Sequence, residues 1–420
     1  MKTLIFEQWP DGHHFNYLEC ITAALSEISD QVIVAMPREA ANSGAFQRIR
    51  TALLSLGNVV FDEEVESLGR DSSKGPGRMV ARNAYLAIKR SAPDYVVLPT
   101  ADEFFVELAA LFMTVGRARL KDIKIEAIIH NKRFGGAGGF LGNISVVARR
   151  IAAFSGVYSR VGFVNFLLWE QLPVRKFSEN NCKFSIVGDP VPDPIRFSKL
   201  QARETLGLNP NVKYLGMVGA LSGLKAVPET LAAFRYRSIQ DESKLLLAGK
   251  MSRSYRELVH QEYGDLVTAG RVVCLDRFLS TEELWMAMAA IDVHCSVYNR
   301  FFGLSSLMLK SLAQDTPVIA DNYGWTGEVV RKFGAGYAAN IADKSEYADV
   351  MTRALQKSEE YRRTEAVDRL LRFHSVKNFT NCVTEGIAAA VGRKPSEEIM
   401  QWPWVVSILG CGIVHENSAS

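Results

Sequence analysis

The chain has 420 residues, of which 48% are hydrophobic and 23% are charged, and its formal net charge is +3. This composition excludes a largely disordered protein, and the length predicts two or three domains, each with its own core. The near balance of charge argues against nucleic-acid binding as the main role. The six cysteines stand far apart and form no CxxC pair, so we expect neither a zinc site nor a disulfide framework.

The N-terminal stretch MKTLIFEQWPDGHH soon reaches charged residues and a Pro-Asp-Gly turn. It leaves no room for the apolar core of a signal peptide. The longest apolar stretches, 104–116 and 408–414, are shorter than the roughly 20 residues that a membrane-spanning helix needs. We therefore expect a cytoplasmic protein that does not cross a membrane.

Short apolar runs alternate with longer amphipathic segments through the first half of the chain. The runs are TLIF (3–6), QVIVAM (31–36), NVVF (58–61), YVVLP (95–99) and IEAII (125–129). This alternation is typical of βα repeats, which form parallel sheets with helices on both faces. The segment GDPVPDP (188–194) then brings three prolines in seven residues, which excludes a helix interior or a central strand. We expect a linker there.

The same rhythm restarts after the linker, and residues 343–391 look almost wholly helical. The runs are KYLGMVG (213–219), KLLLAG (244–249), RVVCL (271–275), IDVHCSV (291–297) and TPVIA (316–320). The expected fold class is therefore α/β, with doubly wound domains at 1–187 and 188–390 and a tail at 391–420. Open α/β folds bind ligands at the carboxyl ends of their strands, so we expect the site in a cleft between the domains.

Six stretches of the second half follow one another in a recognisable order and spacing. They are VGDPVPDPIRF, YLGMVGALSGLKAVPETLAAF, LLLAGK, FLSTEELWMAMAAIDVHCSV, FFGLSSLMLKSLAQDTPVIA and GWTGEVV. Together, over about residues 187–340, they resemble the retaining glycosyltransferases of family 4. The resemblance implies a GT-B fold of two facing Rossmann-like domains, a nucleotide-diphosphate sugar as co-substrate, and no metal or other cofactor. The first half of the chain is similar to the family only in its βα pattern.

The loop VGALSGLK follows the predicted strand at 213–219. The resemblance implies an arginine and a lysine here that hold the donor diphosphate. Lys225 matches the lysine, whereas Ala220 stands at the arginine position. A lysine at a helix start, together with free backbone N–H groups, would stabilise the charge of a leaving diphosphate. Gly219 and Lys225 are therefore candidates, and a solvated helix residue is the alternative for Lys225.

The segment RFFGLSS has the build of an anion-binding helix start. Gly303 would let the backbone approach a phosphate, and Leu304 and Ser305 lead into a first turn whose N–H groups are free. An ordinary loop with serine caps is the alternative. Arg300 could replace the charge missing at Ala220, because a guanidinium group holds phosphate oxygens in pairs.

The family also has two glutamates seven residues apart in this segment, and this chain has neither. Alignment back from TPVIA puts Lys310 at the ribose-binding glutamate, and alignment forward from FFGL puts Met308 there. A lysine cannot accept a hydrogen bond from a hydroxyl. Lys310 would instead reach a phosphate from the helix face of Gly303, or lie in solvent. Glu328 in GWTGE matches a glutamate near the donor, or complements a helix dipole from the first turn.

Three strand ends of the first half carry further candidates. Gly12 and His13 stand in WPDGHHF, where the family keeps a glycine-bearing loop near the acceptor, although paired histidines in such turns are often merely exposed. His130 in IIHNKRF occupies the place of a histidine that faces the donor sugar in related enzymes, so His130 and Lys225 are the catalytic candidates. Asp102 in LPTADEF would orient an acceptor hydroxyl or cap the next helix.

The stretch from 117 to 160 is basic. Its nine Lys or Arg residues stand against Asp122 and Glu126, a local balance of 9 − 2 = +7. A basic face of this kind fits peripheral contact with anionic lipid or with a phosphate-bearing acceptor. A solvated helix face is the alternative.

The resemblance, together with these features, implies transfer of a hexose from a nucleotide-diphosphate sugar, with retention, to a glycan or lipid-linked acceptor, and we expect a role in cell-surface polysaccharide biosynthesis. Lys225 and helix N-termini would carry the leaving-group charge. No carboxylate nucleophile can be assigned, which favours a front-face displacement in which the departing phosphate helps take the acceptor proton. Two alternatives remain: a non-catalytic GT-B homologue that binds a nucleotide or glycan, and a two-domain sugar-nucleotide epimerase.

Overall fold

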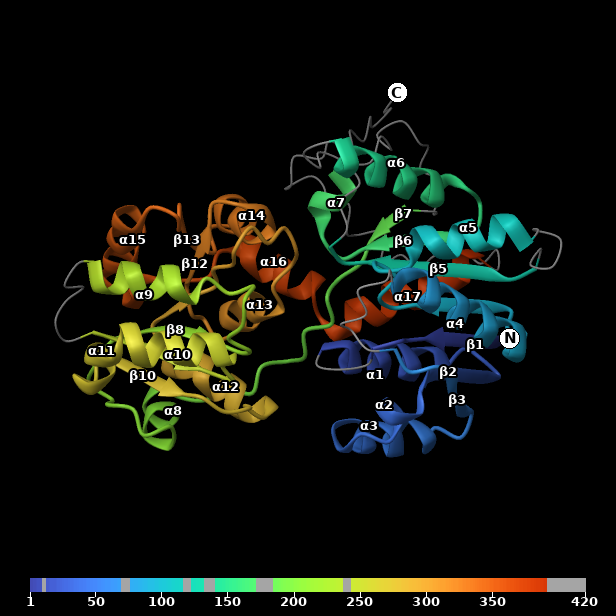
Figure 1. The fold of residues 1–420 in the computed structure, drawn as a ribbon. Helices are drawn as coiled ribbons and strands as arrows, with labels where there is room; N and C mark the ends of the chain where they lie inside the picture. The colour runs from blue at the N-terminus through green and yellow to red at the C-terminus, as the bar shows by residue number, and fades with distance from the viewer. Residues whose placement is uncertain are drawn as a thin grey trace, which may run out of the picture. The chain divides into compact units, whose positions relative to one another are not determined.

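The computed structural model divides the chain into two compact units. Unit 1 comprises Met1–Pro190 and a return segment that starts at Ser375, and unit 2 comprises Val191–His374. Figure 1 shows a parallel sheet with helices on both faces in each unit. The structure describes residues 1–9, 13–68, 76–115, 122–131, 140–170, 184–236 and 243–390.

Unit 1 contains a seven-stranded parallel sheet in the order β3-β2-β1-β4-β5-β6-β7. Its strands are β1 (Lys2–Phe6), β2 (Gln31–Pro37), β3 (Val59–Val65), β4 (Tyr95–Leu98), β5 (Lys124–Ile129), β6 (Arg160–Phe163) and β7 (Phe184–Ile186). Its helices are α1 (His13–Ser26), α2 (Arg38–Ala41), α3 (Gly44–Leu54), α4 (Pro76–Ser91), α5 (Phe105–Val115), α6 (Phe140–Phe154), α7 (Phe166–Glu170) and α17 (Val376–Ala390).

Unit 2 contains a six-stranded parallel sheet in the order β10-β9-β8-β11-β12-β13. Its strands are β8 (Tyr214–Val218), β9 (Lys244–Ala248), β10 (Val272–Leu275), β11 (Val293–Cys295), β12 (Val318–Asp321) and β13 (Gly336–Ala339). Its helices are α8 (Lys199–Thr205), α9 (Val227–Tyr236), α10 (Arg253–Glu262), α11 (Gly264–Thr268), α12 (Thr281–Ala290), α13 (Ser306–Ala313), α14 (Gly324–Phe333), α15 (Lys344–Gln356), the 3-10 turn Ser358–Glu360 and α16 (Glu365–Phe373).

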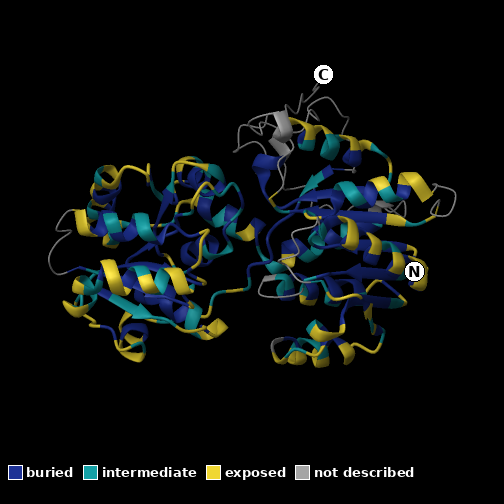
Figure 2. Cartoon of the chain, in the orientation of Figure 1, coloured by how far each residue is buried: buried dark blue, intermediate teal, exposed yellow. Residues whose placement is uncertain are grey.

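The core of unit 2 follows from strands that are apolar on both faces. Alternation along β9 sends Leu245 and Leu247 to the side covered by α9, α10 and α15, and Leu246 to the side covered by α8 and α12. All three leucines are fully buried, and each such burial contributes roughly 1.5–3 kcal/mol. Figure 2 shows the buried strands beneath helices whose outer faces are exposed.

The predicted α/β class with two doubly wound sheets is confirmed, and each apolar run predicted as a strand overlaps one. The strands β6, β7 and β13 were not predicted. The segment from 188 to 194 contains no helix and only an isolated bridge at Val191, as its prolines predict, and the boundary between the two units falls within it, after Pro190.

The structure divides the chain differently from the expected domains at 1–187 and 188–390. The helix α17 belongs to unit 1, because the ring of Phe379 packs 5.0 Å from that of Tyr17 and Arg160 donates a 2.7 Å hydrogen bond to the carbonyl of Cys382. The tail at 391–420 lies outside the described residues.

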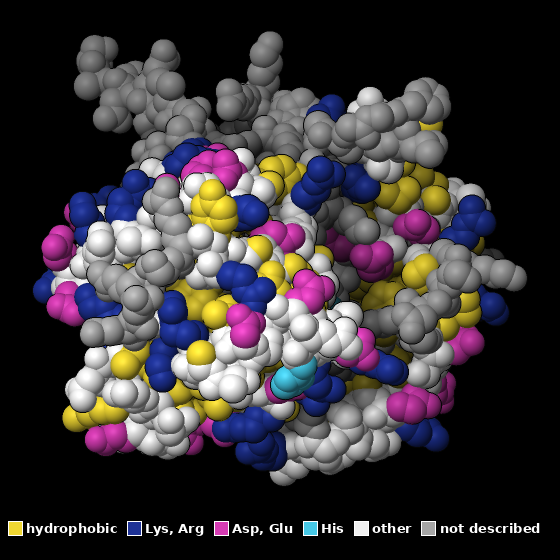
Figure 3. Space-filling model, turned by 60° about the vertical axis from the view of Figure 1, so that its left-hand side comes forward, with side chains coloured by type: hydrophobic (Ala, Val, Ile, Leu, Met, Phe, Trp, Pro, Cys, Tyr) yellow, Lys and Arg dark blue, Asp and Glu magenta, His cyan; other side chains and the backbone are white. Residues whose placement is uncertain are grey.

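The surface carries mixed charge. On the face in Figure 3, basic and acidic side chains alternate with apolar and uncharged ones. Among the described helices, none combines the length and the hydropathy needed to cross a bilayer.

Candidate functional site

The strand order reverses between β8 and β11, which is where doubly wound sheets bind ligands at the carboxyl ends of their strands. The loops that follow these two strands lie against each other. The N–H of Asn299 donates to the carbonyl of Leu224 at 2.9 Å, and Lys225 forms an antiparallel bridge with Tyr298. The loops that follow β8 and β11 therefore meet at the switch point of unit 2.

Lys225 is buried at this switch point, with only 5% of its surface exposed. Its Nζ donates to the carbonyl oxygen of Val218, the last residue of β8, and lies 5.6 Å from the ring centroid of Tyr298. Burial lowers the pKa of Lys225 to about 7. The alternative of a solvated lysine is therefore wrong.

The neighbouring residues His294 and Cys295 of β11 make the surroundings of Lys225 weakly polar. His294 is fully buried, and neither of its ring nitrogens has a hydrogen-bond partner among the described residues. Burial, together with the nearby Lys225 charge, holds the pKa of His294 well below its usual value. Burial also raises the pKa of the Cys295 thiol to about 12. An anion that reached Lys225 would find little competing solvation, so its attraction to the ammonium would be strong.

Two contacts place the start of α13 beside the β8 loop. Ser305 is the N-cap of α13: its Oγ accepts from the N–H of Met308 at 3.2 Å and lies 2.7 Å from the hydroxyl of Tyr298. Gly219 has φ of +97°, and a Cβ added there would lie 2.6 Å from Leu307 Cδ1. The structure thus brings Gly219, Lys225 and Ser305 together.

The N-cap role of Ser305 fits the alternative prediction for the segment FFGLSS, which is an ordinary loop with serine caps. Gly303 and Leu304 lie in the loop before α13, not on the helix. Lys310 therefore cannot share a helix face with Gly303, and this prediction is wrong. Lys310 lies in the last turn of α13 with 8% of its surface exposed, so the solvent-facing alternative is wrong as well.

Glu328 is the fifth residue of α14, beyond its first turn. It pairs with Arg331 and lies 3.7 Å from the Nζ of Lys332 on the same helix. The alternative of a first-turn carboxylate is therefore wrong. Gly324 at the start of α14 has φ of +72°, and a Cβ there would lie 2.4 Å from the carbonyl of Phe301, so the GWTGE and FFGL loops are packed together.

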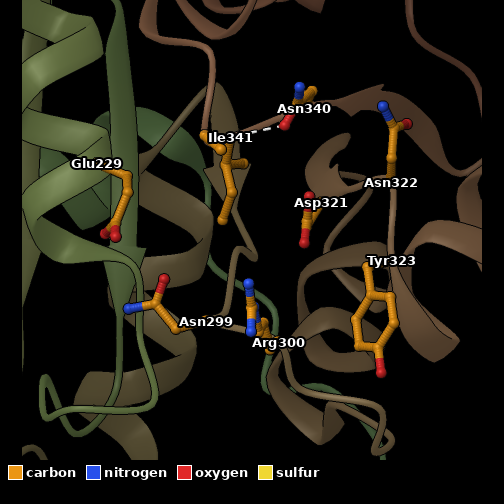
Figure 4. A pocket seen from close by; sticks show the side chains of 9 residues that line it. Glu229, Asn299, Arg300, Asp321, Asn322, Tyr323, Asn340 and Ile341 are labelled. Atoms are coloured by element: carbon orange, nitrogen blue, oxygen red, sulfur yellow. Dashed lines mark hydrogen bonds between the residues drawn. The ribbon is translucent and has the colours of Figure 1, made fainter. Parts of the chain in front are cut away.

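Arg300 is exposed and lines a cavity of about 550 Å³ at the carboxyl ends of β12 and β13 (Figure 4). Neither Lys225 nor Ser305 lines this cavity. Arg300 thus borders this cavity, and Lys225 does not.

In unit 1 the structure places Asp102 beside His130. The Asp102 carboxylate accepts from the N–H groups of His130 and Asn131 at 2.9 and 2.8 Å, so it orients the turn after β5. The His130 ring is part-buried, with its Nε2 2.8 Å from the carbonyl of Pro99 and its centroid 4.9 Å from that of Tyr17. Gly12 lies outside the described residues, and so does the side chain of His13, which begins α1.

Sequence reasoning missed a buried carboxylate at the switch point between β1 and β4. Glu7 follows β1, is 1% exposed, and accepts from Thr100 Oγ1 at 2.6 Å and from the Trp9 N–H at 3.1 Å. His14 Nδ1 lies 3.3 Å from Glu7 Oε2. Burial raises the pKa of Glu7, but His14 and these hydrogen bonds outweigh burial and hold the pKa below its usual value. A charged residue directly after an apolar strand was the signal that could have revealed it.

The basic stretch 117–160 is not a uniform surface. Arg160 is buried in an ion pair with Glu126 at 3.3 Å, so it does not belong to a basic face. Arg149 is partly buried, and burial lowers its pKa. The basic residues at 117, 119, 121, 132 and 133 lie outside the described residues. Within the described chain, no group of three or more His, Cys, Asp or Glu residues could hold a metal ion.

Residues 213–357 match the family model described as Glycosyl transferases group 1. Over 93% of its length the chain also resembles solved structures of GT-B glycosyltransferases, at low sequence identity. It has the GT-B fold. No curated protein matches the chain.

Three of these structures illustrate the match. HepE of Anabaena in complex with UDP and glucose is 16% identical, with a TM-score of 0.62, covering 93% of this chain and 100% of that chain. Sucrose-phosphate synthase of Thermosynechococcus elongatus is 12% identical, with a TM-score of 0.65 and coverage of 90% and 96%. WaaG, a glycosyltransferase involved in lipopolysaccharide biosynthesis, is 12% identical, with a TM-score of 0.58 and coverage of 93% and 100%.

Proposed function

We propose that this protein is a glycosyltransferase that moves a hexose from a nucleotide-diphosphate sugar to a hydroxyl of a glycan or lipid-linked acceptor, with retention at the anomeric carbon. The observation that carries the proposal is the burial of Lys225 at the carboxyl end of β8, inside the segment that matches the glycosyltransferase model. HepE, a structural neighbour, binds UDP-glucose, which supports a nucleotide-sugar donor.

In this proposal Lys225 stabilises the diphosphate as it leaves. Its ammonium is already held at the strand end by Val218, so little reorganisation is needed when charge develops on the phosphate oxygens. Gly219 keeps the β8 loop close to the start of α13, where backbone N–H groups favour an anion. We assign His130 to the catalytic residues, facing the donor sugar, and Asp102 to the acceptor side, both at strand ends of unit 1.

The test is to incubate the protein with UDP-, GDP-, ADP- and CDP-hexoses and a glycan and lipid-linked acceptor extract, and to measure release of the nucleoside diphosphate. Lys225→Ala should lower kcat by about 10²-fold or more, the size expected for loss of one preorganised charge donor. Lys357→Ala, an exposed lysine at the end of α15, is the matched control and should leave kcat unchanged. Proton NMR of the product's anomeric signal tests retention.

A second candidate is a non-catalytic GT-B homologue that binds a nucleotide or glycan. Ala220, and Lys310 or Met308, stand where the resemblance implies an arginine and a glutamate, and these replacements favour it. This reading predicts binding of a nucleoside diphosphate without release from any sugar donor. An epimerase would instead form product with no acceptor present.

We also propose that α6 makes a peripheral contact with an anionic lipid surface in unit 1. Four apolar residues spaced for one helix face are exposed: Ile144 (50%), Val147 (53%), Ile151 (57%) and Phe154 (41%). Arg149 and Arg150 lie on the same helix, and apolar faces with neighbouring basic residues are typical of interfacial helices.

Flotation with vesicles of anionic and of zwitterionic lipid tests this contact. The wild type should float with the anionic vesicles, and Val147→Asn/Ile151→Asn should not. Leu200→Asn removes a side chain of similar exposure, 55%, from unit 2 and should float like the wild type. Equal flotation of all three proteins would disprove the role of α6.

A further inference from the structure

A cavity of about 550 Å³ lies within unit 2, at the carboxyl ends of β12 and β13. This volume falls within the range of roughly 300–1,000 Å³ that is typical of small-molecule sites. Figure 4 shows Glu229 of α9 across from Asp321, with Ile341 between them and the side chain of Arg300 below, beside Asn299. The residues that line the cavity are Glu229, Asn299, Arg300, Asp321, Asn322, Tyr323, Asn340, Ile341 and Ala342.

The backbone fixes Arg300 at this cavity in an unusual conformation. Arg300 has φ of +50°, in the left-handed region that bulky residues rarely adopt. The N–H of the neighbouring Asn299 donates to the carbonyl of Leu224 at 2.9 Å, which ties this loop to the loop after β8. Such strain costs about 1–3 kcal/mol and is concentrated at ligand sites. The backbone conformation that places Arg300 beside the cavity therefore costs conformational free energy.

The charges of the lining do not suit a phosphate. Glu229 and Asp321 supply two carboxylates against one guanidinium, a balance of 1 − 2 = −1. Glu229 Oε2 is buried and has no hydrogen-bond partner among the described residues. Asp321 is partly buried, and its carboxylate interacts with the backbone N–H groups of Ile341 and Asn322. A bound anion would meet both carboxylates, which would repel it.

The hydrogen-bonding capacity of the lining suits a neutral ligand that both donates and accepts. The carboxylates of Glu229 and Asp321 accept, Arg300 donates, and three asparagine amides do both. Tyr323 adds a flat apolar ring with a polar tip at the rim. A sugar ring offers this combination, because its hydroxyl groups donate and accept hydrogen bonds and its C–H groups form an apolar face.

We propose that this cavity binds the ring of a neutral sugar through its hydroxyl groups, independently of any nucleotide. All residues that line this cavity belong to unit 2, whereas the acceptor-side residues were assigned to unit 1, so this sugar site goes beyond the proposed function. The binding itself does not depend on it. The groups that contact the sugar hydroxyls are Glu229, Asn299, Arg300 and Asp321.

Saturation-transfer difference NMR with the full chain tests the proposal. The probes are D-glucose, D-galactose, D-mannose and N-acetyl-D-glucosamine, each measured alone. At least one should give signals with the wild type, and Asn299→Ala and Glu229→Ala should each weaken those signals about tenfold, the loss expected for one hydrogen bond to a charged or well-placed group. Glu257→Ala, at an exposed carboxylate of α10, is the matched control and should keep them.

Thermal-shift measurements with UDP, GDP, ADP and CDP separate this proposal from the donor site. Sugar signals that survive Asn299→Ala and Glu229→Ala, or absence of signals with all four sugars, would overturn the cavity assignment. Loss of the nucleotide response in these two variants would also overturn it, since the cavity would then hold the donor. Sugar binding that depends on the cavity, in a protein that binds no nucleotide, would support the cavity and contradict the proposed function.

Discussion

Lys225 Nζ donates a hydrogen bond to the carbonyl oxygen of Val218, so a buried ammonium group sits at the end of the strand that precedes the switch point. A single backbone carbonyl offers far less stabilisation to a cation than water does. Burial consequently lowers the pKa of Lys225 to about 7. The protonation state of Lys225 therefore changes near neutral pH, and a diphosphate would favour its charged form.

The first prediction concerns stability against pH. Between about pH 7 and the ordinary lysine pKa of 10.5, Lys225 is neutral in the folded protein and protonated in the unfolded chain. Because the unfolded state then binds more protons, stability rises with pH over this window. The Tm of the wild type relative to that of Lys225→Met should therefore increase from pH 7 to pH 9. Lys357→Met is the control, and a pH-independent difference for Lys225→Met would refute the buried, low-pKa lysine.

The second prediction concerns Gly219. Its φ of +97° and the 2.6 Å between an added Cβ and Leu307 mean that Gly219→Ala combines backbone strain with a collision. We expect a loss of about 1–3 kcal/mol in stability, the cost of a residue in an unfavourable backbone region. Gly223→Ala is the matched control, since a Cβ there meets nothing within 4 Å. Equal Tm values for the two variants would show that the β8 loop does not pack against α13 in this way.

The third prediction concerns Glu7. Its folded-state pKa is lower than its ordinary value of 4.5, so its contribution is present above pH 4.5 and is lost as the pH falls through the folded value. Glu7→Gln should cost about 1.5–3 kcal/mol at pH 7, as for lost hydrogen bonds to a charged group. The Tm difference from the wild type should shrink below pH 4.5. Glu39→Gln, at an exposed carboxylate of α2, should leave the Tm unchanged at both pH values.

The fourth prediction concerns the buried pair of Arg160 and Glu126. The Glu126 side chain is fully buried and also accepts from the Tyr95 hydroxyl at 2.8 Å. Arg160→Met leaves the carboxylate unpaired, which should cost about 3–5 kcal/mol. Arg160→Met/Glu126→Gln removes that charge, while the oxygen of the introduced amide can still accept from Tyr95, so the double variant should be more stable than the single one. Chemical denaturation of both variants measures the difference, and a less stable double variant would contradict this account.

The sheets could be predicted because their central strands are apolar on both faces. The run KLLLAG at 244–249 is an example, with leucines buried against different helices on either side. The strand β6 was missed because it begins with Arg160. A buried basic residue is stable only with an ion-pair partner, and that partner, Glu126, is distant in the sequence. The strand β13 was missed because GYAA has no β-branched residue.

The candidate site was only partly predictable, because its surroundings are formed by residues that are distant in the sequence. Gly219 and Lys225 could be placed at a strand end because they end or follow the apolar run KYLGMVG, and the role of Lys225 came from the resemblance. The burial of Lys225 depends on Tyr298 and His294, which come from another strand and its loop. The relation assumed between Gly303 and Lys310 failed because the helix begins at Ser306, and a shift of a few residues at a helix start changes which side chains share a face.

The most direct test of the central claim is a calorimetric titration of the wild type and of Lys225→Ala with UDP, GDP, ADP and CDP. The account predicts that the wild type binds at least one of these nucleotides and that Lys225→Ala weakens its binding by about tenfold or more, the loss expected for a charge-assisted contact. Equal affinity of the two proteins, or no binding by the wild type, would contradict the assignment of the donor diphosphate to Lys225.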